Sequence, residues 1–184
     1  MINKEQEIEL LNFLKYKIKI SDEFIEKSEN RIFLDDIVLI KCKTWRQYAN
    51  YSGARAFHGF FNRIYILDNK KNKIDLSFSS KDEESFNKFG IIIATVIKPL
   101  VSKTTEKIRS GADVNIYKLS FTNNGIYKKG FFGKKFIDWK ECSGARLERG
   151  YLNIYRNSGK KFCSIFMWKD NAILIPEIVK QFKH

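Results

Sequence analysis

The sequence predicts an α+β protein of mostly antiparallel strands, built as two tandem units that each end in a helix. Three observations lead to this fold class. Short stretches alternate polar and apolar residues, as half-buried strands do, and polar turn residues separate them. Each half ends in an apolar stripe at helical spacing. Segments of the first half also recur in the same order in the second, which is typical of a duplicated unit.

The first half opens on apolar residues at helical spacing. Ile8, Leu11 and Leu14 predict an N-terminal helix that ends at about Lys15. From there the period changes to two, which predicts a strand over residues 15–22. Further strands are expected over residues 24–27, 31–43, 63–67 and 73–78, with a polar turn at 68–72.

A second helix is predicted after these strands, because an apolar stripe follows at helical spacing. The stripe consists of Phe86, Phe89, Ile93, Ile97 and Leu100. Pro99 should kink or end this helix, since proline lacks an amide hydrogen, although residues 103–109 could resume it. Ser110-Gly111 is a stop signal. The predicted domains are therefore 1–110, with the N-terminal helix, and 111–184.

The second half repeats the strand pattern from Val114 onwards. Asn123-Asn124-Gly125 is a strong hairpin signal, because asparagine and glycine tolerate positive φ angles. Residues 157–159 mark another turn. Pro176 is expected in the first turn of the final helix, where its missing amide hydrogen costs little. The apolar stripe of that helix consists of Ile175, Ile178, Val179 and Phe182.

The two halves match each other in five places. In order, the matches are residues 19–27 with 119–128, 31–35 with 134–138, Ser52–Arg55 with Ser143–Arg146, 64–78 with 152–166, and 81–82 with 169–170. Each match is short, but all five follow one order and each series ends in a helix. We infer that the halves are copies of one unit.

Three short motifs in the second half carry a family resemblance. They are Gly125-Ile126, Ile137-Asp138-Trp139 and Leu152-Asn153-Ile154. With these motifs, residues 114–184 resemble the small bacterial pleckstrin-homology-like (PH-like) domains, and residues 16–100 resemble them more weakly. The resemblance implies a small barrel of two near-orthogonal antiparallel sheets, with one end closed by a C-terminal helix. Many binding modules share this fold, so it does not fix a function.

The charge is strongly positive, with a formal net charge of +13 and a pI of about 9.6. Residues 111–184 contribute +8 of this charge and residues 1–110 contribute +5. A basic surface lowers the energy of approach to phosphates, anionic lipid headgroups and acidic proteins. The alternative is that lysines scattered over every turn only keep the protein dispersed.

Catalytic chemistry is not indicated. His58 and His184 are the only histidines, and no nucleophile, metal or phosphate-loop motif accompanies them. Cys42, Cys142 and Cys163 stand apart without a CxxC pair, which favours reduced thiols in a cytosolic protein. The opening residues contain no uninterrupted apolar run of the kind a signal peptide needs. We therefore expect no enzyme activity, no catalytic residue, no metal and no cofactor.

Residues 128–135 form a basic segment with two aromatic residues at its centre. Its members are Lys128, Lys129, Phe131, Phe132, Lys134 and Lys135. They could dock an anionic membrane surface, or the two phenylalanines could fold inward. Phosphoinositide-binding members of the resembled family carry a basic cluster in their first strand pair. Lys118, Lys128 and Lys129 lie near that place, and Gly130 stands where those members have an arginine.

The segment Trp45–Phe61 has about a dozen residues without a counterpart in the second half. Its expected partner-binding residues are Trp45, Arg46, Tyr48, Tyr51, Arg55 and Phe57. Aromatic and arginine side chains are typical of protein-interface hot spots and also of single-strand stacking platforms. We expect a loop on a β scaffold that binds an acidic protein or another copy of this chain. The alternative is a long strand pair that only packs.

Together these features predict a non-enzymatic binding or scaffold protein that acts through protein–protein contacts. The alternative function is peripheral binding to anionic lipid, and nucleic-acid binding ranks third. No RNP or KH signature is present, and acids interspersed among the lysines make a nucleic-acid partner the weaker hypothesis. We expect a cytoplasmic location, with the inner membrane face as the site of any peripheral contact.

Overall fold

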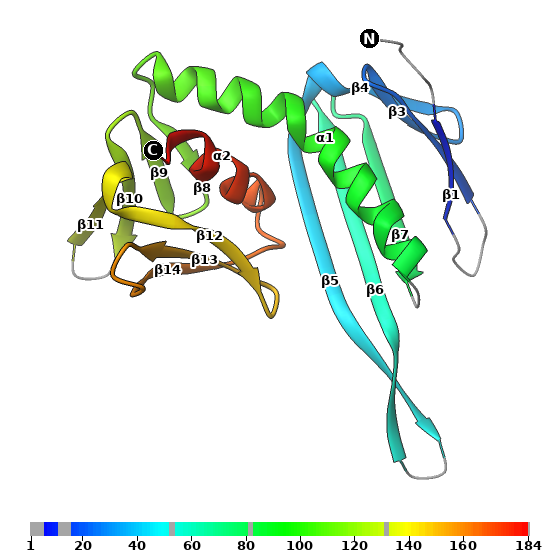
Figure 1. The fold of residues 1–184 in the computed structure, drawn as a ribbon. Coiled ribbons are helices and arrows are strands. Elements are labelled where there is room, and N and C mark those ends of the chain that lie inside the picture. The colour runs from blue at the N-terminus through cyan, green and yellow to red at the C-terminus, as the bar shows by residue number, and fades with distance from the viewer. Residues whose placement is uncertain (1–5, 11–15, 52–53, 81–82, 131–132, 184) are drawn as a thin grey trace. The chain divides into compact units, whose positions relative to one another are not determined.

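The structure, a computed structural model, describes residues 6–10, 16–51, 54–80, 83–130 and 133–183. Within these ranges the chain forms four antiparallel sheets and two α-helices, which confirms the mostly antiparallel α+β class (Figure 1). The chain divides into two compact units, Met1–Pro99 and Leu100–His184. Each unit is described on its own below.

The first unit consists of two strand meanders and the start of a helix. Its four-stranded sheet has the order β1 (Gln6–Leu10), β2 (Tyr16–Ile20), β3 (Phe24–Lys27) and β4 (Asn30–Phe33). A 3-10 turn, η1 (Leu34–Asp36), leads to a three-stranded sheet of β5 (Ile37–Tyr51), β6 (Ala54–Asp68) and β7 (Lys73–Ser80), and α1 (Glu83–Arg109) follows. Alternate isoleucines of both sheets are fully buried and form the core, among them Ile18, Ile25, Ile32, Ile64 and Ile66.

The predicted N-terminal helix is wrong over residues 6–10, which form strand β1. This strand pairs with β2 in antiparallel register, with Ile8 opposite Ile18. Ile8 is buried, whereas Glu7 is exposed and forms an ion pair with Lys17, with 2.6 Å between Oε1 and Nζ. The QEIEL segment therefore follows a two-residue period, and its pairing with a neighbouring strand outweighs the helical spacing seen in the sequence. Leu11 and Leu14 lie outside the described residues.

Helix α1 is continuous through Pro99, so of the two predicted outcomes, a kink or an end, the end is wrong. The buried face is also rotated by one residue relative to the prediction, because Ile93 and Ile97 are only half-buried. Three consecutive isoleucines at 91–93 leave the face ambiguous in the sequence. The buried apolar side chains of α1 are Phe89, Ile92, Val96, Leu100, Val101 and Ile108, and the side chain of Phe86 is not among those described. The chain divides between Pro99 and Leu100, inside α1, and the predicted boundary at 110–111 coincides with the C-terminal end of this helix.

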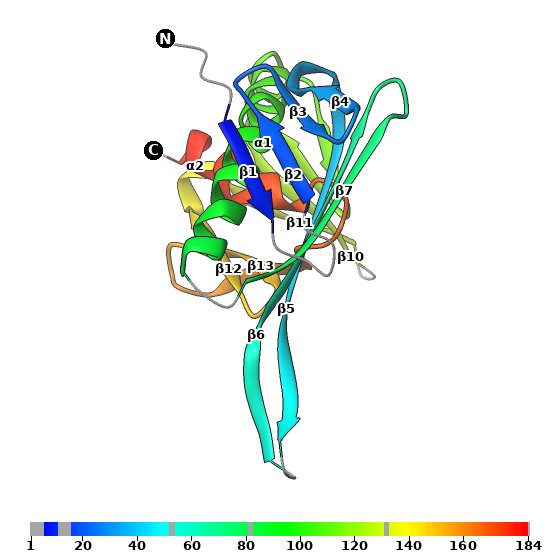
Figure 2. The ribbon, with the colours of Figure 1, turned by 90° about the vertical axis from the view of Figure 1, so that its right-hand side faces the viewer.

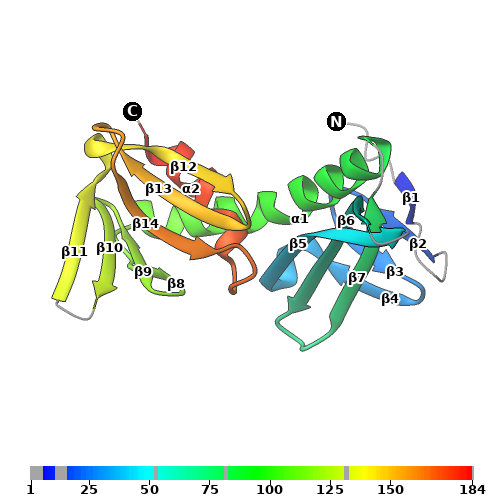
Figure 3. The ribbon, with the colours of Figure 1, turned by 90° about the horizontal axis from the view of Figure 1, so that it is seen from below.

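The second unit has the same element order, again as two meanders followed by a helix (Figure 3). Its four-stranded sheet has the order β11 (Gly133–Asp138), β10 (Gly125–Gly130), β9 (Leu119–Thr122) and β8 (Val114–Ile116). The 3-10 turn η2 (Trp139–Glu141) leads to β12 (Cys142–Glu148), β13 (Tyr151–Arg156) and β14 (Lys161–Phe166). A further 3-10 turn, η3 (Ala172–Leu174), precedes α2 (Ile175–Phe182), which packs against β12 with Pro176 in its first turn, as predicted.

The common element order supports the inferred duplication but corrects its alignment. Leu34 and Trp139 are both the buried first residue of a 3-10 turn. Their amides donate to equivalent carbonyls, Leu34 N to Glu23 O at 2.8 Å and Trp139 N to Asn124 O at 3.4 Å. These contacts make Leu34 equivalent to Trp139, whereas the match of 31–35 with 134–138 paired Leu34 with Ile137. The predicted alignment is therefore shifted by two residues. The match of Ser52–Arg55 with Ser143–Arg146 is also wrong, because Ser143–Arg146 lies in β12, the counterpart of β5, while Arg55 lies in β6.

The four sheets are open in the ranges that the structure describes, so a closed barrel is not shown. Only α2 ends the chain, while α1 continues from the first unit into the second. The coarse prediction of antiparallel sheets followed by helices is confirmed.

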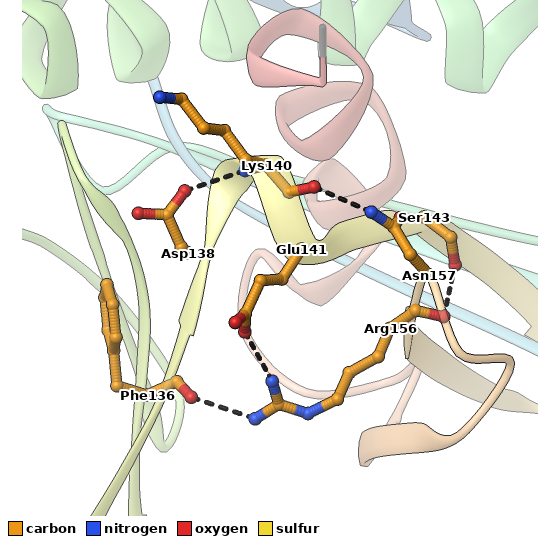
Figure 4. Close-up of polar contacts among 7 residues, drawn as sticks. All are labelled: Phe136, Asp138, Lys140, Glu141, Ser143, Arg156 and Asn157. Atoms are coloured by element: carbon orange, nitrogen blue, oxygen red, sulfur yellow. Dashed lines mark hydrogen bonds and ion pairs between the residues drawn. The ribbon is translucent and has the colours of Figure 1, made fainter.

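The Ile137-Asp138-Trp139 motif lies at the corner between β11 and β12, and Figure 4 shows the polar contacts around Asp138. The Asp138 carboxylate accepts a hydrogen bond from Lys140 N at 2.8 Å and so caps η2. This turn places the Trp139 ring in the core, stacked on Phe182 with centroids 4.7 Å apart. Arg156 secures the corner from β13, because it donates to Glu141 Oε2 at 2.6 Å and to the Phe136 carbonyl at 3.0 Å.

Candidate binding surfaces

The predicted partner-binding segment forms a strand pair and not a loop. β5 and β6 pair from Ile37 opposite Asp68 to Tyr51 opposite Ala54. β7 pairs with β6 only between Phe60 and Leu67. From the β5–β6 turn as far as residue 59, the two strands pair only with each other. Figures 1 and 2 show this two-stranded ribbon extending past the end of β7. We call residues 47–51 and 54–59 the arm.

The arm has an irregular register at its base. Gln47 pairs with Gly59 and Tyr48 pairs with Phe57, so β6 has one extra residue, His58, at this point. Gly59 has a φ angle of +141°. A bulge of this kind bends the strand and increases its twist. It therefore separates the arm from the regular three-stranded part of the sheet.

The predicted residues are distributed along this ribbon. Tyr48, Tyr51, Arg55 and Phe57 lie in the arm, and Trp45 and Arg46 pair with Phe61 and Phe60 at its base. The side chains of residues 45–58 are not among those described. The structure does give the backbone of the arm. It consists of two strands, and no described strand pairs with the outer edge of either one.

The basic segment of residues 128–135 forms the hairpin of β10 and β11. Lys128 lies opposite Lys135, and Lys129 lies opposite Lys134. Lys129, Lys134 and Lys135 are exposed, whereas Lys128 is half-buried. Like charges opposite each other repel, so a bound anion would stabilise this arrangement. Phe131 and Phe132 lie outside the described residues, so neither proposed orientation of their rings is tested.

Three lysines converge on one hollow of the second unit, with a volume of about 680 Å³. Lys129 and Lys134 come from the β10–β11 hairpin, and Lys118 comes from the turn before β9. The Lys129 amide donates to the Lys118 carbonyl at 3.2 Å, which fixes the two segments side by side. Asp113 is the one carboxylate among the lining residues. The structure thus gathers part of the predicted anionic-surface set at one place.

A third surface was not predicted from the sequence: the outer face of the sheet β12–β13–β14. Tyr151 and Phe166 lie opposite each other on β13 and β14, and their ring centroids are 4.2 Å apart. Trp168 follows, with its ring 5.6 Å from that of Phe166. We call Tyr151, Phe166 and Trp168 the aromatic face. The alternation in residues 151–155 signals an outward position for Tyr151, but only the strand register places Phe166 beside it.

A polar network lies on the same sheet face. Glu148 accepts hydrogen bonds from Tyr155 Oη at 2.6 Å and from Asn153 Nδ2 at 2.8 Å, while Ser164 donates to Asn153 Oδ1 at 2.6 Å. The bond from Tyr155 is the main cause that lowers the pKa of Glu148, and the same bond raises the pKa of Tyr155. The contribution of Glu148 to stability is therefore present at neutral pH and is lost as the pH falls through its folded-state pKa.

The three cysteines are buried free thiols. Burial raises the pKa of Cys42 to about 12 and that of Cys163 to about 11. Burial also raises the pKa of Cys142. A thiolate is the reactive form of cysteine, so at neutral pH these side chains are core residues and poor nucleophiles.

Comparison with protein-family models, with curated proteins and with solved structures finds no match. The PH-like resemblance therefore stays a prediction based on the motifs and on the element order. No helix among the described residues is long and apolar enough to cross a membrane.

Proposed function

We propose that this protein is a non-enzymatic cytosolic binding or scaffold protein that contacts a protein partner through the arm. The observation that carries the proposal is the two-stranded extension of β5 and β6 beyond β7. An isolated two-stranded ribbon is at best marginally stable in water. A partner that pairs with an edge or covers the arm would supply the missing interactions.

The residue types of the arm favour a protein partner. Tyr48, Tyr51 and Phe57 offer large flat side chains that lose little conformational entropy on binding. Arg55, together with Arg46 at the base, can pair bidentately with carboxylates. These features fit an acidic protein or a second copy of this chain, with β-strand addition along an open edge as the mode of contact.

The element order also supports two PH-like units in tandem. Each half has four strands, a 3-10 turn, three strands and then a helix. The arm is absent from the second copy, since β12 ends at Glu148 and β13 begins at Tyr151, after a two-residue turn. The repeated fold therefore does not require the arm, which is why we assign the arm a function of its own.

Substitutions in the arm and at its base should remove the partner without unfolding the protein. We expect Trp45→Ala/Arg46→Ala/Tyr48→Ala to lose at least about 2 kcal/mol of binding free energy, as hot-spot residues do. Pull-down from native lysate, with sedimentation velocity to detect self-association, measures this loss.

Phe33→Ala/Val38→Ala is the matched control for this experiment. It removes two exposed apolar side chains from the same unit, away from the arm. The control should recover the partner at the wild-type level, and circular dichroism must show that both variants are folded. Equal recovery with the arm variant would mean that the segment only packs.

The second candidate function is peripheral binding to anionic lipid through the β10–β11 hairpin. The observation in its favour is the facing lysine pairs, three of whose four members are exposed. Each lysine close to an anionic bilayer contributes about 1 kcal/mol. The inner membrane face is the anionic surface that a cytosolic protein meets.

Removing one lysine pair should weaken vesicle binding by about 2 kcal/mol, or roughly thirtyfold, from the contribution of each lysine. The variant is Lys129→Gln/Lys134→Gln, and the assay is sedimentation with phosphatidylserine-containing vesicles at low salt. Lys71→Gln/Lys73→Gln removes the same charge from the exposed β6–β7 turn and should bind like wild type. Equal binding of wild type to neutral and anionic vesicles, or equal loss in both variants, would rule the hairpin out.

A further inference from the structure

The aromatic face of the second unit presents three rings in a row. Tyr151, Phe166 and Trp168 keep 38%, 41% and 42% of their surface exposed. Their mutual ring contacts of 4.2 and 5.6 Å hold them as a row of exposed rings. This surface is therefore suited to a ligand with flat faces of its own.

Cations continue the row beyond Trp168. Lys169 Nζ lies 4.3 Å from the centroid of the Trp168 ring and 5.1 Å from that of Tyr117. Lys118 Nζ lies 5.5 Å from the same Tyr117 ring, which is 48% exposed. Rings and ammonium groups thus alternate along one stretch of the surface. A ligand that follows this row meets flat apolar faces and positive charges in turn.

A polar hollow borders the other end of the row at Tyr151. It has a volume of about 770 Å³ and is also lined by Arg149 and Lys161. The one carboxylate among its lining residues is Glu148, which already accepts hydrogen bonds from Tyr155 and Asn153. Arg149 and Lys161 outnumber this carboxylate, so the lining carries a net positive charge that suits an anionic ligand.

We propose that this surface binds single-stranded nucleic acid. Unpaired bases stack on exposed aromatic rings, and phosphates pair with interleaved lysines and arginines. A duplex hides its base faces and offers the rings nothing to stack on. Protein partners can also pack on aromatic rings, but the alternation of rings and lysines at Trp168, Lys169, Tyr117 and Lys118 matches the alternation of bases and phosphates in an unpaired strand. Charge complementarity together with accessible rings therefore favours an unpaired strand, and this activity goes beyond the protein contacts assigned to the arm.

Binding of the full-length chain to fluorescein-labelled 15-nucleotide strands, measured by fluorescence anisotropy, tests this inference. DNA and RNA strands are tested separately, because both offer unpaired bases and phosphates. Binding of either strand that depends on the aromatic rings supports the inference. Wild type should bind an unpaired strand more tightly than the corresponding duplex. Phe166→Ala/Trp168→Ala should weaken binding at least tenfold, since stacking on each ring contributes several-fold or more.

Phe33→Ala is the matched control, because it removes another exposed ring, 49% of whose surface is accessible, from the first unit. It should bind within about twofold of wild type. Lys169→Gln keeps every ring and should weaken binding several-fold with a shallower salt dependence. The inference is overturned by duplex binding as tight as single-strand binding, by equal loss in both ring variants, or by no binding at low salt.

Discussion

Replacing Gly125 with alanine is expected to destabilise the second unit by about 3 kcal/mol or more, at the upper end of the cost of overpacking. An added Cβ would lie 2.2 Å from the Ile137 carbonyl oxygen and 2.8 Å from Phe136 Cε2. The φ angle of +156° adds backbone strain. The strands cannot simply move apart, because Ile126 and Ile137 are both fully buried and pair in register.

Gly159→Ala provides the control for this prediction. Gly159 also has a positive φ angle, +77°, but a Cβ added there would meet no other atom within 4 Å. Its replacement should cost only about 1–2 kcal/mol, the usual penalty for a left-handed residue. Urea denaturation followed by circular dichroism measures both variants. Similar losses in the two would show that the β10–β11 pair can open to accept a side chain at position 125.

Trp139→Ala is expected to cost about 3–5 kcal/mol, as large-to-small replacements of a buried aromatic ring do. The ring is stacked on Phe182 and lies 6.4 Å from Phe121, so its loss leaves a cavity between the sheet and α2. Trp139 Nε1 also donates to the Thr122 carbonyl at 3.0 Å. Trp139→Phe should cost about 1–3 kcal/mol, because it keeps a ring but leaves that buried acceptor unpaired.

Trp168→Ala is the matched control, since this ring is 42% exposed. Its removal should change the free energy of unfolding by no more than about 1 kcal/mol, as is usual at the surface. Urea denaturation again gives the comparison. If the two tryptophan variants lost equal stability, Trp139 would not be the centre of the core of the second unit.

Local sequence signals predicted the strands well where polar and apolar residues alternate cleanly. Strand β3 has the predicted bounds of residues 24–27, and the turn between β6 and β7 falls at the predicted polar residues. The prediction for the N-terminus was wrong because the sequence QEIEL and the residues after it fit both the helical period and the two-residue period of a strand. Only pairing with β2 decides between them, and the sequence does not display that pairing.

The inferred repeat agrees with the common element order of the two halves, but the match of residues 31–35 with 134–138 was out of register by two residues. Sequence matching aligned Phe33 with Phe136, whereas the structure equates Leu34 with Trp139 as the buried residue of the 3-10 turn. The shared buried position in the 3-10 turn decides this alignment. Sequence matching misses it because leucine and tryptophan are different residue types. The aromatic face was missed for a similar reason, because Tyr151 and Phe166 become neighbours only through the pairing of β13 with β14.

The assignment of partner binding to the arm is tested most directly by site-specific photo-crosslinking. A photo-reactive phenylalanine analogue is placed at position 48 or 57 in the arm and, as control, at position 38, which is exposed and lies on the same strand β5 as position 48. We expect a discrete covalent adduct, with a partner or a second copy, from positions 48 and 57 and none from position 38. No adduct from the arm, or the same adduct at equal yield from position 38, would contradict it.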